Sequence, residues 1–352
     1  MDYNKILIIN LGGAGDLLLS TPALKALRKK YPQSEICALV SQRGVELASS
    51  LPYLNKVFCF YINYGGSSSL LKQLSNIKSL LYLRKHRFDL AINMRSIVSE
   101  SGAGKIKLVM DIISPKMKAG RNTQERGSFF DIKIPEQDIG IKPEMEYDID
   151  TIAALGVKDF DRKIDLEIDK TGDERVKEIL RNESVGEKEI LVGIHPGGMP
   201  SRRWPAENFA SLIKLISNEI DCKFVLTGDK QENGLVERIS RLSEKKVVNL
   251  AGKLNFFELA ALINKCNIFI SNDTGPMHIA AVLDKPLVAI FGPGDIVRFD
   301  PRNISKNVIV VRKETAGCKF PCNKQSCDTL DCLKQIHPEE VLQAVFSLLN
   351  RK

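Results

Sequence analysis

The chain has 352 residues, of which 43% are hydrophobic, and its 51 Lys and Arg against 43 Asp and Glu give a net charge of +8. This length predicts two domains, each with a core of its own. No apolar run approaches the roughly 20 residues that span a bilayer, which argues against an integral membrane protein. The apolar segment 6–19 holds Asn10, Asp16 and three glycines, so we interpret it as strand and loop, not as a signal peptide, and expect a cytoplasmic protein.

Apolar runs alternate with helical patterns in the N-terminal half. Residues 5–10, 36–40, 57–61 and 90–93 have the composition of short buried strands. A helix is predicted over 22–30, with Thr21 as the N-cap and Pro22 in the first turn. Strands alternating with helices predict an α/β protein with a parallel, doubly wound sheet. The Gly/Ser-rich residues 63–69 are predicted to form a mobile loop.

The same α/β pattern restarts after a charged stretch at 165–188, so we predict domains over 1–170 and 171–352. Strands are expected over the apolar runs 190–195, 222–227, 247–250, 268–271 and 287–291. Helices are expected over 205–216, 256–264 and 338–350, the second opened by the capping box of Asn255 and Glu258. Two Rossmann-like halves of this kind would face each other across a cleft.

The stretch Cys266 to Gly292 is the most informative part of the chain. It predicts strand, loop, helix and strand, with Asp273, Thr274, Gly275 and His278 gathered where the first strand ends. Ligands of open parallel sheets bind outside the carboxyl ends of the strands. A helix start offers N–H groups and a dipole that suit phosphate. The stretch therefore predicts a nucleotide site, with a purely structural βαβ unit as the alternative.

Two glycine-rich loops follow other predicted strands. In the first, Gly12, Gly13 and Gly15 permit a sharp turn and close approach of a ligand, and Asp16 is a candidate proton acceptor. The alternative for Asp16 is a turn or helix cap. The second loop contains Gly197, Gly198 and Arg202, which could hold a diphosphate, unless it is a plain strand–helix connection. Trp204 beyond it is predicted to be a core residue.

Several other motifs point elsewhere. The segment 101–105 fails the spacing of a phosphate-binding P-loop. The strings 148–150 and 159–161 spell the Asp-x-Asp of metal-dependent sugar transferases, but both lie in charged stretches that we interpret as solvated surface. We therefore expect no catalytic metal.

The eight cysteines divide into two groups. Four of them lie in apolar, strand-like contexts and are predicted to be buried thiols. The other four cluster within fifteen residues near the end of the chain and could form a structural metal site or remain reduced thiols. The clustered cysteines are Cys318, Cys322, Cys327 and Cys332.

Basic residues outnumber acidic ones between Lys72 and Lys133. A basic face there would suit an anionic partner, such as a lipid headgroup or a phosphorylated glycan. Aromatic residues are not interleaved with the cations as stacking platforms for bases, which argues against nucleic acid. An ordinary solvated surface is the alternative. The segment 72–133 includes Arg84, Lys85, Arg87, Arg95, Lys105, Lys107, Lys116, Lys118, Arg121 and Arg126.

Taken together, five segments resemble glycosyltransferase family 9, the ADP-heptose:lipopolysaccharide heptosyltransferases. In chain order they read ILIINLGGAGDLLLSTPALKALRKKYP, HPGGMPSRRWPAENFASLI, FVLTGDKQE, NLAGKLNFFELAALI and NDTGPMHIAAVLDKPLVAIFGPGD. The cysteine-rich tail followed by Ile336-His337-Pro338 is also similar to the usual end of the family. Residues 60–165 match no motif of the family that we can name.

The resemblance implies a GT-B fold with the acceptor in the first domain and a nucleotide-sugar in the second. It implies inverting, metal-independent transfer without a cofactor, from ADP-heptose or a similar donor to an anionic, lipid-linked glycan, with peripheral contact at the inner face of the membrane. The general base of the family falls on Asp16, and its donor-phosphate loop on Gly197 and Gly198. Its lysine two residues before the Trp is replaced by Arg202, which keeps the charge but changes the geometry.

The remaining donor-side roles are also implied by the resemblance. The acidic residue near the nucleotide ribose falls on Glu232. Asp273, Thr274, Gly275 and His278 match the donor-binding motif directly. Two other functions stay open: a non-catalytic nucleotide-sugar-binding module, and an NAD-dependent Rossmann oxidoreductase, against which the broken glycine spacing argues. The sugar, acceptor, linkage and oligomeric state do not follow from the sequence.

Overall fold

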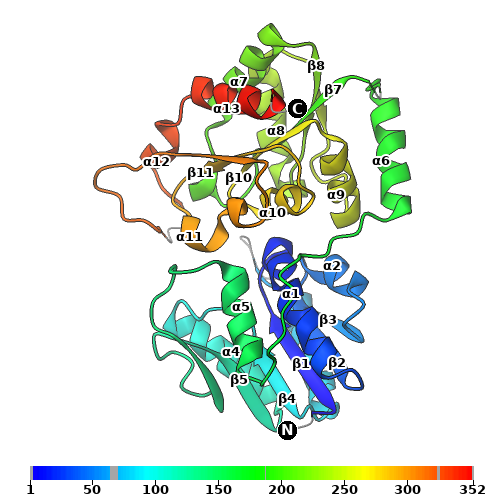
Figure 1. Ribbon diagram of the computed structural model, residues 1–352, viewed down its shortest axis with the longest axis vertical. Helices are drawn as coiled ribbons and strands as arrows, with labels where there is room; N and C mark the ends of the chain where they lie inside the picture. Colours follow the sequence, from blue (N-terminus) through cyan, green and yellow to red (C-terminus); the bar gives the residue numbers. More distant parts are fainter. Residues whose placement is uncertain (1–2, 64–69, 187, 323–325, 351–352) are drawn as a thin grey trace. The chain divides into compact units, whose positions relative to one another are not determined.

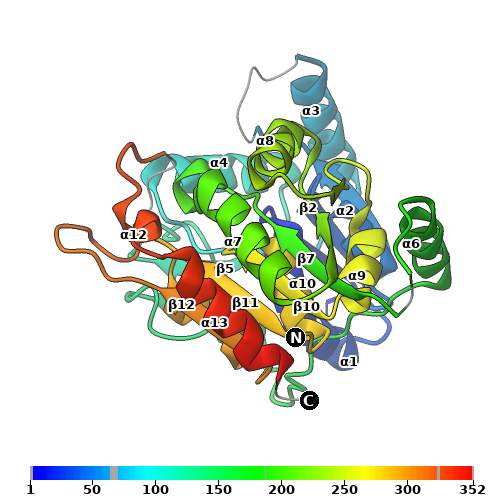
Figure 2. The same ribbon diagram turned by 90° about the horizontal axis from the view of Figure 1, so that it is seen from above.

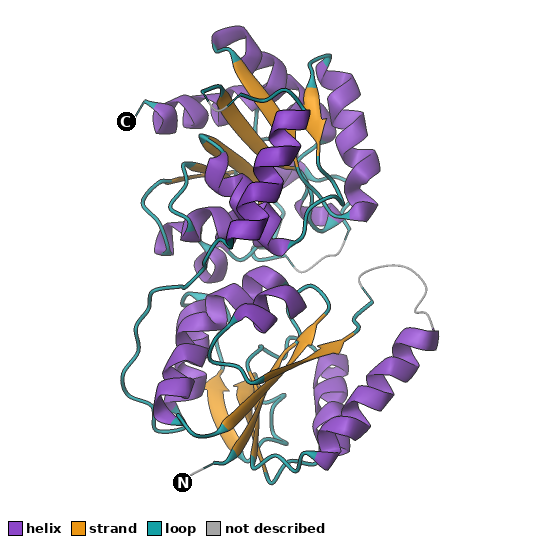
Figure 3. Cartoon of the chain, turned by 90° about the vertical axis from the view of Figure 1, so that its right-hand side faces the viewer, coloured by secondary structure: helices purple, strands orange, loops and turns teal. Residues whose placement is uncertain are grey.

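The computed structural model describes residues 3–63, 70–186, 188–322 and 326–350, and the chain separates into the units Met1–Asp165 and Leu166–Lys352 (Figure 1). Each unit is built on one six-stranded parallel sheet with helices on both faces, which confirms the predicted α/β fold (Figure 3). Most of the loop predicted at residues 63–69 falls outside the described residues. None of the described helices is long and apolar enough to cross a membrane.

The sheet of the N-terminal unit has the strand order β3-β2-β1-β4-β5-β6. Its order reverses between β1 and β4, which is the switch point where doubly wound sheets bind ligands. The strands are β1 (Lys5–Asn10), β2 (Glu35–Ser41), β3 (Lys56–Phe60), β4 (Leu90–Asn93), β5 (Met117–Thr123) and β6 (Ile132–Glu136). Sequence analysis did not predict β5 and β6, since neither is a continuous apolar run.

Helices cover both faces of this sheet. One layer contains α1 (Ala14–Lys30), α2 (Val45–Ser50) and α5 (Glu144–Ala153), and the other contains α3 (Leu70–Lys85) and α4 (Glu100–Ile113). Leu7 and Ile9 of β1 alternate toward the second layer, where they pack with Leu80, Leu83 and Met110. The rejected P-loop-like segment lies inside α4.

Helix α1 differs from its prediction because it begins eight residues earlier, at Ala14. Asp16 at the third helical position accepts the N–H of Gly13 at 2.8 Å and so stabilises the helix start there. Pro22 then lies inside the helix, where it cannot donate to the carbonyl of Leu18. The hydroxyl of Thr21 donates to that carbonyl at 2.8 Å instead, so the predicted cap residue repairs the gap left by the proline.

The sheet of the C-terminal unit has the order β12-β11-β10-β7-β8-β9, which repeats the topology of the first sheet and reverses between β7 and β10. Its sixth strand, β12, was not predicted from the sequence. The strands are β7 (Ile190–His195), β8 (Cys222–Leu226), β9 (Val247–Asn249), β10 (Ile268–Asn272), β11 (Leu287–Phe291) and β12 (Val308–Arg312).

Helices α7 (Ala206–Glu219), α8 (Asn233–Ser243) and α13 (Pro338–Leu349) cover one face of this sheet, and α9 (Phe256–Lys265) and α10 (Gly275–Val282) cover the other (Figure 2). Helix α6 (Lys170–Asn182) packs on α9, and the short helices α11 (Ile296–Phe299) and α12 (Asp331–Lys334) lie in the later loops. The capping box of Asn255 and Glu258 is present, as predicted. Trp204 is 1% exposed and donates to the carbonyl of Ile336 at 3.0 Å, which confirms its core position.

Candidate functional site

Each unit gathers polar side chains at the switch point of its own sheet. In the N-terminal unit, Asp16 follows β1 and Arg95 follows β4, the two strands between which the order reverses. Arg95 Nη1 lies 2.8 Å from Asp16 Oδ1, and each side chain is 23% exposed. The same carboxylate receives the Gly13 N–H on Oδ2. Asp16 is therefore held on both oxygens while its edge remains accessible to solvent.

The glycine loop in front of Asp16 leaves room for its carboxylate. A Cβ on residue 12 would lie 2.6 Å from Asp16 Oδ2, so a side chain there would displace the acid. The N–H of Gly12 is bound to the side chain of Asn10, which also donates to Ser20 at 2.9 Å. Gly15 is buried in the first turn of α1. Close packing therefore requires a glycine at position 12, whereas a Cβ on Gly13 would lie 3.7 Å from Asp16 Oδ2 in ordinary contact and Gly15 belongs to the helix.

A buried ionic cluster lies behind this pair, and it was missed in sequence analysis. Arg121 on β5 is fully buried and binds Glu144 at 2.9 Å, Asp148 by a shorter contact, and Glu136 at 3.5 Å. Arg95 also reaches Glu144, at 3.2 Å, which links the cluster to Asp16. Burial lowers the pKa of the Arg95 guanidinium, but the nearby carboxylates outweigh burial and leave that pKa raised overall.

Two predictions are wrong at this cluster. Asp148 was interpreted as solvated surface, yet it is fully buried and accepts the Ser20 hydroxyl at 2.6 Å. Arg121 was counted with a basic surface, yet it neutralises buried acids. Burial raises the pKa of Asp148 to about 6, against the opposing effect of Arg121. The cluster was missed because its members lie on three separate elements, β5, β6 and α5, and only the folded unit brings their side chains together.

The C-terminal unit places the second glycine loop after β7 and the Asp-Thr-Gly segment after β10. Asn272 joins the two, because its side-chain amide donates to the carbonyls of Pro196 and Gly197 at 2.8 and 3.1 Å. Its oxygen accepts the N–H of Trp204 at 3.2 Å. Asn272 is therefore a positioning residue for both loops, and sequence analysis did not assign it that role.

Glu232 lies beneath the glycine loop. Its carboxylate accepts the N–H of Gly198 at 2.7 Å and that of Asp229 at 2.9 Å, and it pairs with Arg203 at 2.9 Å. Burial raises the pKa of Glu232, but His195 and the two N–H donors outweigh burial and hold that pKa below its usual value. These contacts make Glu232 a brace for the loop. A role at the nucleotide ribose remains a prediction.

The glycines of this loop are required because side chains of other residues lie too close for a Cβ. Gly198 has a φ of +120°, which disfavours any residue with a Cβ, and a Cβ there would lie 2.4 Å from Thr274 Cγ2. A Cβ on Gly197 would lie 2.2 Å from Glu232 Oε2. His195, at the end of β7, bonds Thr227 at 3.0 Å, and burial lowers its pKa despite the opposing effect of Glu232. The backbone of this loop therefore passes close to Thr274 and Glu232. Such close packing of glycines is typical of sites where a ligand contacts main-chain atoms.

Arg202 and Asp273 meet at the end of β10. Arg202 Nη1 lies 2.9 Å from Asp273 Oδ2, with the arginine side chain 22% exposed and the aspartate 4%. A Cβ on Gly294, in the loop after β11, would lie 1.9 Å from the same Asp273 oxygen. Asp273 is therefore enclosed by two loops, and it pairs with Arg202, which was predicted to hold a diphosphate.

Helix α10 starts at the same point. Gly275 is its first residue and Thr274 its N-cap, and within the described residues no side-chain hydrogen bond caps this helix. Its dipole is therefore available to an anion at the sheet edge. His278 is 5% exposed, and its ring lies edge-on to Phe299 with the centroids 6.1 Å apart. Asp273, Thr274, Gly275 and His278 thus lie together, as predicted, with His278 largely beneath the surface.

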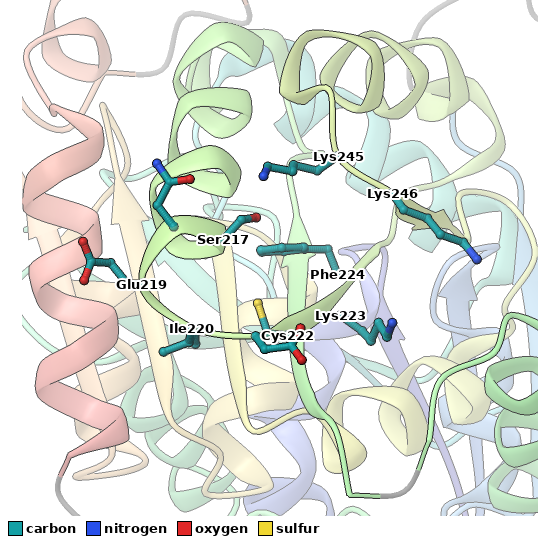
Figure 4. Close-up of a pocket in the computed structure, with 10 residues that line it drawn as sticks. Ser217, Glu219, Ile220, Cys222, Lys223, Phe224, Lys245 and Lys246 are labelled. Atoms are coloured by element: carbon teal, nitrogen blue, oxygen red, sulfur yellow. The ribbon is translucent and has the colours of Figure 1, made fainter.

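A separate hollow of about 400 Å³ lies at the opposite edge of this sheet. It is lined at the amino end of β8 by Asp221, Cys222 and Lys223, and before β9 by Lys245 and Lys246 (Figure 4). Because parallel sheets bind ligands at the carboxyl ends of their strands, we do not assign this hollow to the donor.

The four cysteines predicted to be buried follow that prediction in part. Cys37 and Cys266 are buried, whereas Cys59 and Cys222 are half-buried. Burial raises the pKa of the Cys266 thiol to about 12 and that of Cys37 to about 11. Both thiols are therefore held in their protonated form, as expected of structural core cysteines.

The four clustered cysteines differ in exposure, and a metal site among them remains a prediction. Cys318 is exposed and Cys322 and Cys327 are half-buried, whereas Cys332 is buried in the hydrophobic core beneath α12. Across the ranges that the structure describes, no group of three or more His, Cys, Asp or Glu is placed to hold a metal ion. None of Cys318, Cys322, Cys327 and Cys332 forms a disulfide in this structure, so reduced thiols remain the alternative. Burial raises the pKa of the Cys332 thiol, and the nearby thiols Cys318, Cys327 and Cys322 raise it further, so Cys332 lies near the other three although it is part of the core.

The two Rossmann-like units and their strand-end loops define a GT-B glycosyltransferase fold. The profile of glycosyltransferase family 9 (heptosyltransferase) matches residues 78–330, and the chain belongs to this family. Lipopolysaccharide heptosyltransferase 2 of Salmonella typhimurium is 25% identical over 362 residues, covering 99% of both chains. Family membership decides against the oxidoreductase and the non-catalytic module considered above.

Solved structures show the same fold. ADP-heptose lps heptosyltransferase II of E. coli superposes with a TM-score of 0.73 at 22% identity, over 99% of both chains. A family 9 glycosyl transferase from Veillonella parvula superposes with a TM-score of 0.77 at 23% identity, covering 100% of this chain and 98% of the other. The chain therefore has the GT-B fold of heptosyltransferases over its whole length.

Proposed function

We propose that this glycosyltransferase moves a heptose, or a related sugar, from ADP-heptose or a similar nucleotide-sugar to a lipopolysaccharide core or another anionic glycan. The donor binds the C-terminal unit and the acceptor binds the N-terminal unit. The observation that carries the proposal is the donor motif of a family 9 chain assembled at a sheet switch point, with Asp273 fixed by Arg202 and the start of α10 beside it.

On the donor side, the diphosphate lies at the start of α10 and near the exposed part of Arg202. The helix N-terminus and the guanidinium both favour the negative charge that grows on the leaving diphosphate. Asp273 is itself anionic and does not contact phosphate. It holds Arg202 in place at the end of β10.

On the acceptor side, Asp16 takes the proton from the attacking hydroxyl. Each carboxylate oxygen can accept two hydrogen bonds, so the bonds to Gly13 and Arg95 leave capacity for the acceptor. Arg95 fixes the orientation of the acid, which a general base requires. The hydroxyl oxygen attacks the anomeric carbon from the face opposite the diphosphate, so the configuration inverts.

We propose that no divalent metal takes part in transfer. Asp148 is committed to Arg121 and Ser20, Asp159 pairs with Lys29, and Asp161 pairs with Lys25, so the Asp-x-Asp strings have other partners. Transfer should continue in excess EDTA. Loss of transfer in EDTA with recovery on addition of Mg²⁺ or Mn²⁺ would show that this part of the proposal is wrong.

The decisive experiment presents the full-length protein with a panel of nucleotide-sugars. A donor that binds the native state raises the melting temperature by mass action, by an amount that grows with its concentration. The stabilising donor is then supplied with a delipidated core oligosaccharide, and the release of nucleoside diphosphate is measured. ADP-heptose should stabilise the protein most and support release that depends on acceptor. Stabilisation by a different nucleotide-sugar would correct the donor, and no release with any acceptor would refute the proposed transfer.

A further inference from the structure

The loop after β4, which carries Arg95, is anchored to a buried acid on another strand. The hydroxyl of Ser96 donates to Glu136 Oε1 at 2.7 Å. The N–H of Ile97 donates to Thr123 Oγ1 at 2.9 Å, and the Thr123 hydroxyl in turn donates to the second carboxylate oxygen of Glu136. The backbone directly after Arg95 is therefore fixed from the buried side of the unit.

The guanidinium of Arg95 is fixed from the same side by Glu144, the first residue of α5. Arg95 Nη1 lies 2.8 Å from Asp16 Oδ1 and 3.2 Å from Glu144 Oε1, so one nitrogen bridges the two acids. The two acids differ in accessibility, because the side chain of Asp16 is 23% exposed and that of Glu144 is 0% exposed. The buried acid therefore sets where the nitrogen lies, and the nitrogen in turn fixes one edge of the accessible acid.

Glu144 is itself held by buried charge. Its Oε1 atom lies 2.9 Å from Nη1 of Arg121, which is fully buried. Asp148, one turn further along α5, contacts the other terminal nitrogen of Arg121, and the ring of Tyr147 lies 5.3 Å from the guanidinium carbon. Loss of one of these partners would leave a buried charge uncompensated, so the arrangement is strongly favoured.

The elements that carry these residues pack directly on one another. Helix α5 packs on α1, which carries Asp16, and on β5, which carries Arg121 (Figure 1). Strand β4, which leads to Arg95, lies between β1 and β5 in the sheet. Glu144 therefore lies where the supports of the Asp16 carboxylate meet, and the proposed transfer has not yet given it a role.

We propose that Glu144 is a positioning residue for Asp16. It holds the Arg95 guanidinium against one edge of the carboxylate, so the remaining lone pairs of Asp16 meet an acceptor hydroxyl in one orientation. A general base that is displaced loses rate, because proton transfer requires hydrogen-bond reach. Glu144 touches no substrate, since its side chain is fully buried. This inference rests on the proposed role of Asp16 as the base.

A double-mutant cycle separates this role from the alternative, in which Glu144 only neutralises Arg121. Glu144→Gln keeps the size of the side chain and removes its charge, so the attraction on Arg95 weakens. In the wild-type background kcat should fall about two- to fivefold, which is the low end of the couplings found within one ionic network. In the Arg95→Met background the same substitution should change kcat by less than about 1.5-fold, because the route to Asp16 is already broken.

Two further measurements accompany kcat, which is followed as release of nucleoside diphosphate from ADP-heptose with a delipidated core oligosaccharide. The KM for ADP-heptose should stay within about twofold of wild type in every variant, because the donor residues belong to the other unit. The melting temperature should fall in both backgrounds, because the contact between Glu144 and Arg121 is weakened in each.

Glu146→Gln is the matched control. Glu146 belongs to the same helix and pairs with Arg162 at 2.6 Å, so its substitution also removes a carboxylate and an ion pair. Residues two positions apart on a helix do not share a face, so Glu146 does not replace Glu144 behind Arg95. The kcat of this control should equal that of its parent in both backgrounds.

Two results would overturn the inference. One is wild-type kcat in Glu144→Gln with a lowered melting temperature, since Glu144 would then only neutralise Arg121. The other is an equal loss of kcat in both backgrounds, since Glu144 would then act by a route that does not include Arg95. Either result, together with a loss of about 10²-fold in Asp16→Asn, would remove the positioning role and leave the base in place. Normal turnover in Asp16→Asn would instead refute the base itself.

Discussion

The substitution Asp16→Asn tests the assignment that matters most for the chemistry. Asp16 contacts the N–H of Gly13 and the guanidinium of Arg95, so it has a structural role whether or not it is the base. The amide oxygen of Asn can still accept from Gly13, but the pair with Arg95 is lost. Because both partners are 23% exposed, that pair is worth up to about 1 kcal/mol.

The two roles predict effects of different size. A loss of about 1 kcal/mol lowers the melting temperature of a unit of this size by about 2–4 °C. Loss of a general base lowers turnover by about 10²-fold or more, which corresponds to about 3 kcal/mol in the barrier. Donor affinity should be unchanged, since the donor residues belong to the other unit. Turnover is measured as acceptor-dependent release of nucleoside diphosphate, and donor affinity by calorimetry.

Arg95→Met is the matched control. It removes the ion pair with Asp16 and the contact with buried Glu144 while leaving the Asp16 carboxylate, so we expect an equal or larger drop in melting temperature but less than a tenfold loss of turnover. The reasoning is refuted if Asp16→Asn turns over within a few-fold of wild type. It is equally refuted if Arg95→Met loses as much turnover as Asp16→Asn, because Asp16 would then matter only as a cap and ion-pair partner.

Three further predictions follow from the packing. The pKa of Asp148 is raised to about 6 from an ordinary 3.8, so the native state binds a proton more readily than the unfolded chain. The free energy of unfolding of the wild type, relative to that of Asp148→Asn, should therefore rise by about 1 kcal/mol as the pH falls from 7 to 5. An equal shift of the urea midpoint in both proteins between the two pH values would contradict this. Gly198→Ala places a Cβ against Thr274 at a position with a positive φ, so it should destabilise the protein by about 1–3 kcal/mol and weaken donor binding. The control is Gly234→Ala, where a Cβ contacts nothing within 4 Å; it should leave donor binding unchanged and stability unchanged or slightly raised. Asp273→Ala and His278→Ala should weaken donor binding. Because both residues are buried and Asp273 pairs with Arg202, some loss of melting temperature is expected as well. Normal donor binding in both variants would instead make the two residues structural.

Much of the fold was predictable because its signals are local. The strands that form the centre of each sheet are short apolar runs, and the loops after them carry glycine and acidic residues in a fixed order along the chain. The predicted strands of residues 5–10, 90–93, 190–195 and 287–291 have the bounds observed in the structure. The family resemblance rested on those same loops. Strands β5 and β6 were missed because their residues pack around a buried ion cluster and not in a uniform apolar layer.

The sequence by itself determined which residues lie at the strand ends, because chain order and strand length place Asp16, Gly198 and Asp273 there. Only the tertiary structure decided what those residues contact. Arg95 reaches Asp16 because β4 lies beside β1, and Asn272 joins two loops because β10 lies beside β7. The burial of Arg121 among three carboxylates had no local signal, since a charged residue in a short strand has the same sequence pattern whether its partners are water or buried acids. The partners of Arg121 are set by how the strands and helices pack, and that packing exists only once the sheet has formed.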